Sequence, residues 1–489
     1  MTAIGGFEGL VLPDRQLYAG AAALKAHDFL PDENPCTTEA FADIPIASSS
    51  DVDSMVAAAK AALNDPLWRD CSPLQREGWL HRLANAIESD LPRLAALEAL
   101  DTGKPVVLAE AVDIPAAVAW LRTYAGWPSK LAGRSAPLAA TPGRYHVYSR
   151  REPVGVVAAI TPWNFPIVLS MWKIAPALAA GCAVILKPAP ETPLTALRLA
   201  EIAREIGMPP GVFQVITGDA STGAALARHP DVAKIAFTGS TATGRSILQA
   251  GIPEFKRITL ELGGKSPSII HRDADVEPAL AQAAMSCFFN SGQVCYAGTR
   301  LYVHRSLYER VLEGIAKIAA SQTLGASSNR GSQLGPLISA SHHAKVSGLV
   351  QRARQSGLKV TGTTAMLPPK GHYFAPLVFR DVPADAEIAR EEVFGPVLIS
   401  SAFDELDEAI TLANDSRYGL AAHLWTQNLT AAHHAAARLQ TGTVFVNCAL
   451  LADPAFPFGG MKHSGLGREN GSEALDAYLE PKTVVMSLS

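Results

Sequence analysis

Two kinds of hydrophobic pattern divide the chain. Up to about residue 127, apolar residues recur at helical spacing; Ser72-Pro73 predicts an N-cap with its first turn, and Gly103 predicts a stop. From residue 154 onward, short apolar runs alternate with helical stretches. The predicted strands cover residues 154–160, 182–187, 212–216, 234–238 and 258–262, and the predicted helices cover residues 167–180, 193–206, 221–228 and 241–249. This alternation predicts an α/β fold with a doubly wound parallel sheet.

A second β/α series begins after Gly263 and predicts a second domain. Its strands are predicted at residues 268–270, 300–303, 397–403 and 443–447, and a long loop at residues 454–467. Residues 144–151 and the tail 483–489 also read as strands, which would complete a sheet within or between subunits. Parallel sheets bind ligands at the carboxyl ends of their strands, so the loops after these strands are where functional residues are expected.

Composition narrows the class of protein. With 489 residues, 48% of them hydrophobic and 18% charged, the chain can bury more than one core. The net charge of −4 comes from well-mixed charges without a basic stripe, which argues against a nucleic-acid partner. The most apolar stretch, residues 154–186, is interrupted by prolines, so we expect no membrane span, and the N-terminus lacks the pattern of a signal peptide.

The cysteine and histidine patterns argue against a metal site. The six cysteines form no CxxC pair, which indicates a reducing, cytoplasmic compartment. The pairs His342–His343 and His433–His434 lie in polar, helix-like stretches and are interpreted as solvated helix faces.

Three residues on turns could together form a catalytic centre. Cys295 follows a Gly-containing turn after a helical segment, Glu261 stands between leucines at a strand end, and Asn164 lies on a turn fixed by two prolines. Each has a plainer explanation: a buried structural cysteine, a salt-bridged glutamate, and an asparagine that stabilises its turn. Together they offer a nucleophile, a general base and an oxyanion donor.

Five strings of residues, in order, resemble the NAD(P)-dependent aldehyde dehydrogenase superfamily. They are TPWNFP, LELGGK, FFNSGQVC, EEVFGP and PFGGMKHSGLGRE, and the resemblance runs from about residue 34 to residue 482. The strings KPAPETPL and FNSGQVCYAGTRLYV resemble most strongly those of phenylacetaldehyde dehydrogenases.

The resemblance implies roles for five catalytic residues. Cys295 would attack an aldehyde to give a thiohemiacetal, and Asn164 with the Cys295 backbone N–H would hold its oxyanion. Glu261 would activate the water that hydrolyses the resulting thioester. Lys173 and Glu469 match positions that the family associates with a proton relay, although a plain ion pair would explain them equally well.

The cofactor is expected to lie along the strand ends. Gly239 and Ser240 follow a strand and open a helix, which makes a pyrophosphate site. By resemblance, the other cofactor residues are Trp163, Lys187, Leu262, Glu392 and Phe394. Family members committed to NAD often carry a glutamate three residues beyond the equivalent of Lys187, where this chain has Pro190. We expect NAD, with NADP left open.

Apolar side chains predict an aryl or medium-chain aldehyde as substrate. By resemblance, the substrate tunnel is lined by Phe165, Leu169, Trp172, Phe289 and Phe456. Betaine aldehyde is an alternative, since an aromatic cage can hold a quaternary ammonium group. A CoA-acylating dehydrogenase and a non-enzymatic protein that kept the fold are further alternatives.

The predicted architecture has three parts. Residues 1–128 and 151–263 form a Rossmann-like NAD(P)-binding domain, residues 264–465 the α/β catalytic domain, and residues 129–150 and 480–489 a small β oligomerisation element. The resemblance implies a homodimer or homotetramer.

Overall fold

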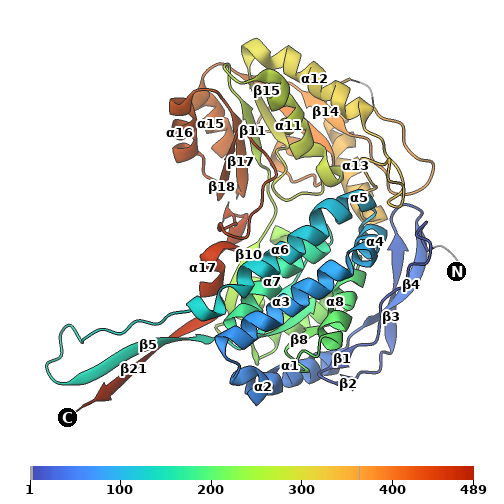
Figure 1. Ribbon diagram of the computed structural model, residues 1–489. Coiled ribbons are helices and arrows are strands. Elements are labelled where there is room, and N and C mark those ends of the chain that lie inside the picture. Colours follow the sequence, from blue (N-terminus) through green and yellow to red (C-terminus); the bar gives the residue numbers. More distant parts are fainter. Residues whose placement is uncertain (1–3, 363, 489) are drawn as a thin grey trace.

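The computed structural model describes residues 4–362 and 364–488, and it has two lobes and a projecting arm (Figure 1). Residues 1–3 of the predicted cofactor domain and Ser489 of the predicted tail strand lie outside the described residues.

The first lobe is built on a six-stranded sheet in the order β20-β10-β9-β6-β7-β8. Its strands are β6 (Val156–Ile160), β7 (Ala183–Lys187), β8 (Phe213–Val215), β9 (Val232–Thr238), β10 (Arg257–Glu261) and β20 (Gly465–Leu466). All neighbours are parallel except β20, which is antiparallel to β10. Because the first strand lies in the middle and later strands extend the sheet both ways, the predicted doubly wound sheet is confirmed.

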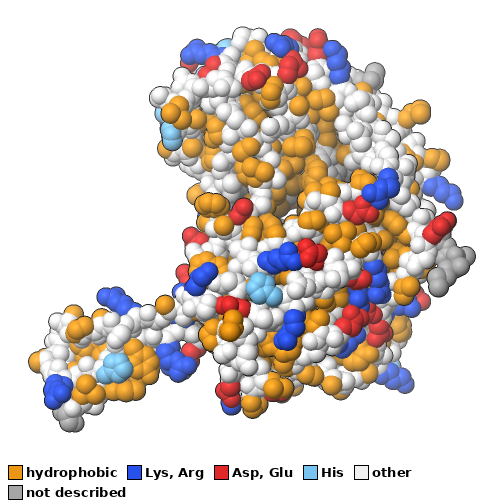
Figure 2. All heavy atoms as spheres, viewed as in Figure 1, with side chains coloured by type: hydrophobic (Ala, Val, Ile, Leu, Met, Phe, Trp, Pro, Cys, Tyr) orange, Lys and Arg blue, Asp and Glu red, His pale blue; other side chains and the backbone are white. Residues whose placement is uncertain are grey.

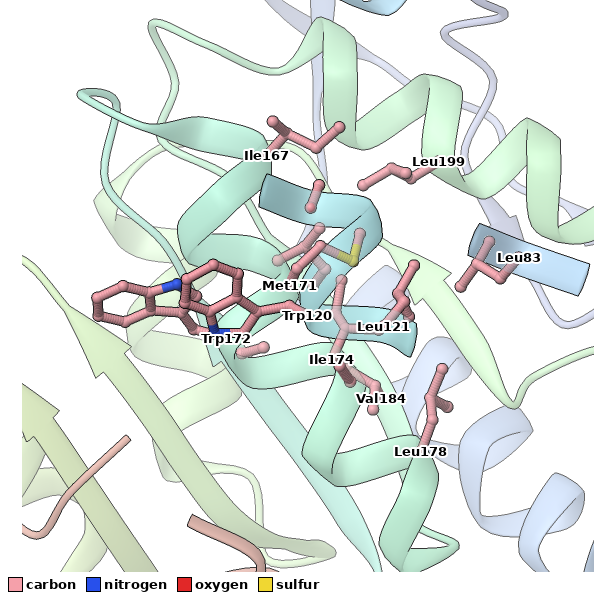
Figure 3. Packing of buried hydrophobic residues seen from close by; sticks show 14 of the residues in the cluster. Leu83, Trp120, Leu121, Ile167, Met171, Trp172, Ile174, Leu178, Val184 and Leu199 are labelled. Carbon is pink, nitrogen blue, oxygen red and sulfur yellow. The ribbon is translucent and has the colours of Figure 1, made fainter. Parts of the chain in front are cut away.

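Helices cover both faces of this sheet. One face carries α3 (Pro73–Ser89), α4 (Leu91–Thr102), α6 (Ile114–Ala125), α7 (Pro166–Ala180) and α8 (Leu194–Glu205); the other carries α1 (Ser49–Asn64), α9 (Ala220–Arg228) and α10 (Thr241–Gly251). Successive residues of β6 point to opposite faces of the sheet and pack in two different hydrophobic cores. Val157 and Ala159 pack in the core on the α7 side, and Val156 and Ala158 in the core on the α1 side. Figure 3 shows the α7 side of this packing, where every residue of α7 is buried.

The N-terminal region is less helical than its pattern predicts. Two small antiparallel pairs, β1 (Tyr18–Ala19) with β2 (Ala22–Ala23) and β3 (Asp28–Asn34) with β4 (Glu39–Ile46), precede the first helix. The predicted boundaries further on are confirmed. Ser72 and Gln75 form a capping box, and Gly103 ends α4 with φ = 74°, a left-handed conformation that favours glycine.

The second lobe holds a seven-stranded sheet in the order β13-β14-β15-β12-β11-β17-β18. Its strands are β11 (Pro267–Ile270), β12 (Arg300–His304), β13 (Lys359–Thr361), β14 (Leu377–Arg380), β15 (Val397–Phe403), β17 (Ala421–Trp425) and β18 (Thr443–Val446). Its helices are α11 (Val276–Phe288), α12 (Tyr308–Ser321), α13 (Ala340–Gln355), α14 (Glu387–Arg390), α15 (Leu406–Asn414) and α16 (Leu429–Arg438). Only β13 is antiparallel to its neighbour. The sequence pattern missed β13, β14 and β17, because apolar runs this short do not distinguish a strand from a helix segment.

Five short elements complete the chain. They are α2 (Pro66–Arg69), α5 (Val106–Leu108), β16 (Tyr418–Gly419), β19 (Met461–Lys462) and α17 (Gly471–Asp476). The predicted loop 454–467 contains β19 and β20, and β20 returns the chain to the first lobe.

The arm is a two-stranded antiparallel ribbon of β5 (Tyr145–Pro153) and β21 (Leu479–Ser487). The two strands pair with each other within the chain. Hydrophobic side chains gather on the arm (Figure 2), and Tyr145, Val485 and Met486 are exposed there. Among the described residues, no helix is long and apolar enough to cross a membrane.

Candidate active site

A cavity of about 230 Å³ lies where the two lobes meet, at the carboxyl ends of β6, β9 and β10. Nine of the residues predicted to act in catalysis, cofactor binding or substrate binding line it: Trp163, Asn164, Leu169, Gly239, Ser240, Leu262, Cys295, Glu392 and Phe394. The chain thus brings segments from both lobes to the switch point between β6 and β9, where a doubly wound sheet binds ligands.

A strained turn presents Cys295. After α11 the backbone passes through three consecutive left-handed residues, Asn290 (φ 50°), Ser291 (φ 55°) and Gly292 (φ 72°). A Cβ on Gly292 would lie 2.2 Å from the carbonyl of Gly395, so only glycine fits there. Buried hydrogen bonds hold the turn; the Ser291 hydroxyl, for example, donates to the Gly335 carbonyl at 2.7 Å. Strain of this kind is typical of functional turns.

The environment of Cys295 favours the neutral thiol before substrate binds. Burial raises the pKa of Cys295, and the nearby carboxylates of Glu392 and Glu261 raise it further. A nucleophilic thiolate therefore has to be generated with the help of a base or of the bound reactants.

Asn164 is oriented by two sets of hydrogen bonds. Its side-chain nitrogen donates to the backbone carbonyl of Gln293 at 2.9 Å. Its backbone carbonyl accepts from the side-chain amide of Asn290 at 3.1 Å. The side-chain amide carries two N–H groups, so one remains for an oxyanion formed at Cys295.

Glu261 ends β10 as a buried carboxylate. Neither of its side-chain oxygens has a hydrogen-bond partner among the described residues. Burial raises the pKa of Glu261 well above its usual value, and the charge of Glu469 adds to this, while Lys173 opposes it. An acid with a raised pKa suits a general base.

Lys173 and Glu469 form a buried ion pair at 2.5 Å, with side chains 0% and 2% exposed. The Lys173 ammonium also donates to the Thr238 hydroxyl at 2.6 Å. The second carboxylate oxygen of Glu469 has no partner among the described residues. The ion pair is therefore present, and the relay role stays a prediction.

The predicted cofactor residues line two adjoining cavities. The second, of about 680 Å³, shares Pro162, Trp163, Thr238, Gly239 and Ser240 with the first and extends to Lys187. Ser240 caps α10 and accepts from the Thr243 N–H, which leaves the helix N-terminus facing this cleft. In the first cavity, the Glu392 carboxylate accepts a hydrogen bond from the Gly264 N–H at 2.9 Å.

Lys187 at the end of β7 is nearly buried. Its ammonium donates to the Gly218 carbonyl at 2.8 Å, and burial lowers its pKa to about 8. This site, the α10 N-terminus and Glu392 together form an elongated cleft with the polar groups that a dinucleotide requires.

His342 corrects the interpretation of the 342–343 pair as a solvated helix face. It lines the first cavity, its ring lies 5.2 Å from that of Trp163 and 6.0 Å from that of Phe394, and its Nε2 lies 2.7 Å from the Phe394 carbonyl oxygen. Burial lowers the pKa of His342 to about 4, so the ring is neutral. The sequence of α13 is polar, so it does not show which of the two histidines faces the cleft. The packing of α13 against the cleft places His342 there.

The predicted substrate residues separate into two groups. Phe165 and Phe289 stack with centroids 6.2 Å apart, and Trp172 stacks on Trp120 at 5.8 Å (Figure 3). Phe456, however, is 72% exposed. Two residues further on, Phe458 contacts both Trp172 and Tyr296, at 5.1 and 5.4 Å. Phe458 and Tyr296 were not among the predicted site residues, although both lie inside the quoted motifs.

The six cysteines are free, and the described residues contain no cluster of three or more His, Cys, Asp or Glu that could hold a metal ion.

Comparison with known proteins gives consistent findings. Residues 24–484 match the aldehyde dehydrogenase family. The chain is 46% identical over 457 residues to a putative aldehyde dehydrogenase, DhaS, of Bacillus subtilis, covering 93% of this chain and 92% of that protein. It is 42% identical over 493 residues to a phenylacetaldehyde dehydrogenase of Pseudomonas fluorescens, covering 99% and 98%. The structure of an NAD+ complex of an aldehyde dehydrogenase from Bacillus cereus superimposes with a TM-score of 0.94 at 41% identity, covering 97% and 96%.

Proposed function

This chain belongs to the aldehyde dehydrogenase family, and on that premise we propose that it oxidises an aryl or medium-chain aldehyde to the acid with NAD. The observation that carries the proposal is the meeting of Cys295, Asn164 and the polar cleft in one cavity, with the buried carboxylate Glu261 at the end of the adjoining strand β10. NAD, when bound along the cleft, accepts the hydride that the aldehyde carbon loses.

Cys295 and Asn164 act first. The Cys295 thiol gives up its proton to solvent as its sulfur attacks the aldehyde carbon and forms a thiohemiacetal, and the free N–H of the Asn164 side chain stabilises the oxygen anion. Loss of hydride leaves a thioester on Cys295. Buried hydrogen bonds hold the turn at residues 290–292, and Cys295, which follows this turn, lines the cavity.

Glu261 acts second. It takes a proton from the water that attacks the thioester, which releases the product as its carboxylate and restores the Cys295 thiol. Its raised pKa suits that task, because burial makes the carboxylate a stronger proton acceptor than an exposed one. The Glu469 carboxylate then takes up the proton by way of Lys173, whose ammonium gives one proton to Glu469 as it gains one from Glu261.

The adenosine end of the cleft supports NAD over NADP. Pro190 replaces the acid expected there, but the next residue, Glu191, lines the same cavity with Lys187 and Asp219. A carboxylate at this end repels a 2′-phosphate and suits a ribose hydroxyl. Arg228 also lines this cavity, and its positive charge favours a 2′-phosphate.

The aromatic side chains support a neutral apolar substrate. Phe165, Phe289 and Trp172 are packed against other rings rather than arranged as an open cage, which disfavours a quaternary ammonium group. Glu261 argues against a CoA-acylating reaction, since hydrolysis of the thioester needs a base and transfer to CoA does not.

The test is the formation of reduced cofactor with NAD and NADP separately. The substrates are phenylacetaldehyde, benzaldehyde, hexanal, betaine aldehyde and succinic semialdehyde, each with and without CoA. Turnover of the first three with NAD supports the proposal. Preference for betaine aldehyde would contradict the aryl or medium-chain substrate class. Dependence on CoA would show that the thioester is transferred to CoA and not hydrolysed. A folded protein that binds no NAD would indicate a non-enzymatic role.

We also propose that the arm joins subunits into a homodimer or homotetramer in the cytoplasm, and that the domains divide as predicted, with 129–150 and 480–489 as the oligomerisation element. Exposed edge strands with apolar side chains favour a partner. Light scattering after gel filtration measures the subunit number, and a monomer would contradict this.

A further inference from the structure

Lys104 is a buried charge close to the site that the reaction itself does not use. It follows Gly103, the left-handed residue that ends α4. Its ammonium lies 2.6 Å from Asp113 and 3.6 Å from Glu98, and all three side chains are 0% exposed. Burial raises the pKa of Glu98 to about 7 and also raises that of Asp113. A cluster this costly to bury often gives little net stability, so its contacts point to another use.

Those contacts lead to the turn that carries Asn164. The Lys104 ammonium donates to the Asn164 carbonyl at 3.1 Å. One oxygen of Glu98 accepts from the N–H of Ile167 at 3.4 Å, and the other accepts from the Thr195 hydroxyl at 3.0 Å. The cluster therefore holds the end of the turn between β6 and α7 and the first turn of α7.

The same ammonium also backs the predicted substrate wall. It lies 4.5 Å from the ring centroid of Phe165, the residue between Asn164 and α7, and Phe165 in turn stacks on Phe289. A cation over a ring face is attracted to it. One side chain thus fixes the carbonyl of the oxyanion donor and the ring beside it.

We propose that Lys104 is a positioning residue: held by Glu98 and Asp113, it fixes the 164–167 turn so that the Asn164 amide faces Cys295. This rests on the proposed role of Asn164 as oxyanion donor. Without Lys104, the only other hydrogen bond to the Asn164 carbonyl among the described residues comes from Asn290, which itself stands on the strained turn. An oxyanion donor works only within a few tenths of an ångström, and a displacement of about 1 Å costs roughly 100-fold in rate.

The test measures the pre-steady-state burst of NADH, which reports thiohemiacetal formation and hydride loss. Lys104→Met is expected to slow the burst by about 10- to 100-fold while the dissociation constant of NAD changes less than about twofold. Lys256→Met is the matched control, because Lys256 is a nearly buried lysine that donates to the carbonyls of His229 and Val232. Its burst rate is expected to stay within about twofold of the parent.

Lys104→Met leaves two buried carboxylates unpaired and threatens folding. The triple variant Glu98→Gln, Lys104→Met, Asp113→Asn removes the charges together and is expected to recover the thermal midpoint without recovering the burst. A triple variant that regains both would overturn the proposal, because the cluster would then serve stability alone.

A double-mutant cycle with Asn164→Ala separates this proposal from the one it rests on. If Lys104 acts through Asn164, Lys104→Met slows the burst in the parent and changes it less than about twofold in the Asn164→Ala background. Equal slowing in both backgrounds would overturn the positioning role. An Asn164→Ala enzyme with a normal burst would instead refute the oxyanion role of Asn164, and the role of Lys104 with it.

Discussion

The buried pair of Lys173 and Glu469 allows the relay and the plain ion pair to be told apart. In Glu469→Gln, the amide keeps an acceptor near the Lys173 ammonium but removes the negative charge 2.5 Å from it. The change also removes a carboxylate whose second oxygen has no partner among the described residues. Both stability and turnover should therefore respond, and they can be measured separately.

The stability change follows from burial. The two side chains are 0% and 2% exposed, and removing one partner of a buried pair typically costs about 3–5 kcal/mol, since the other charge stays in a poorly solvated place. We expect a loss of that size in the free energy of unfolding by urea. Glu277→Gln, which breaks an exposed pair with Arg310, is the control and should leave the unfolding midpoint unchanged.

The catalytic change is measured on folded enzyme. If Glu469 receives the proton from Glu261, thioester hydrolysis slows by about tenfold or more, so Glu469→Gln gives a full burst of NADH followed by a slow steady state. Glu261→Gln gives the same shape with a slower second phase. A Glu469→Gln enzyme that loses stability but keeps its steady-state rate per folded active site would refute the relay and leave a plain ion pair.

Three further predictions test other parts of the site. Cys295→Ala should abolish dehydrogenase activity while NAD binding by calorimetry stays unchanged; retained turnover would contradict the assignment of the nucleophile. Glu191→Gln should raise the ratio of kcat/KM for NADP to that for NAD by about tenfold, since it removes a carboxylate from the adenosine cavity, and an unchanged ratio would place the selection elsewhere. Since burial lowers the pKa of His342 to about 4 from 6.5, the unfolded chain takes up a proton below pH 6.5 that the folded chain does not. The free energy of unfolding therefore falls with the pH, by about 2 kcal/mol for this residue between pH 7.5 and 5. In the absence of NAD, the free energy of unfolding of His342→Gln should fall correspondingly less over the same range. An equal fall in the parent and the variant would refute this role of His342.

Local patterns predicted the parts of the fold that depend on local forces. Five buried strands alternating with helices gave the doubly wound sheet, and the Ser72 cap and the Gly103 stop stand where the residues indicate. The strands β14 and β17 were missed because such short runs carry no distinctive period.

The site was predictable to the extent that its residues sit in motifs. Cys295 and Asn164 do so, and they meet in one cavity as expected, with Glu261 on the adjoining strand. His342, Phe458 and Lys104 owe their places to contacts between distant segments, such as the bond from Lys104 to the Asn164 carbonyl. No periodicity or spacing encodes contacts of that kind.

The short strand β20 has a consequence for how the protein is made. It pairs with β10 at Glu261, yet it lies beyond the whole second lobe in the chain, and β21 likewise closes on β5. Domains generally fold from the N-terminus during synthesis. The second lobe can therefore be finished while the first still lacks an edge strand and the arm still lacks a partner. The strand carrying Glu261, the proposed general base, is completed among the last parts of the molecule, so a partly synthesised chain holds Cys295, the proposed nucleophile, before the surroundings of Glu261 are finished.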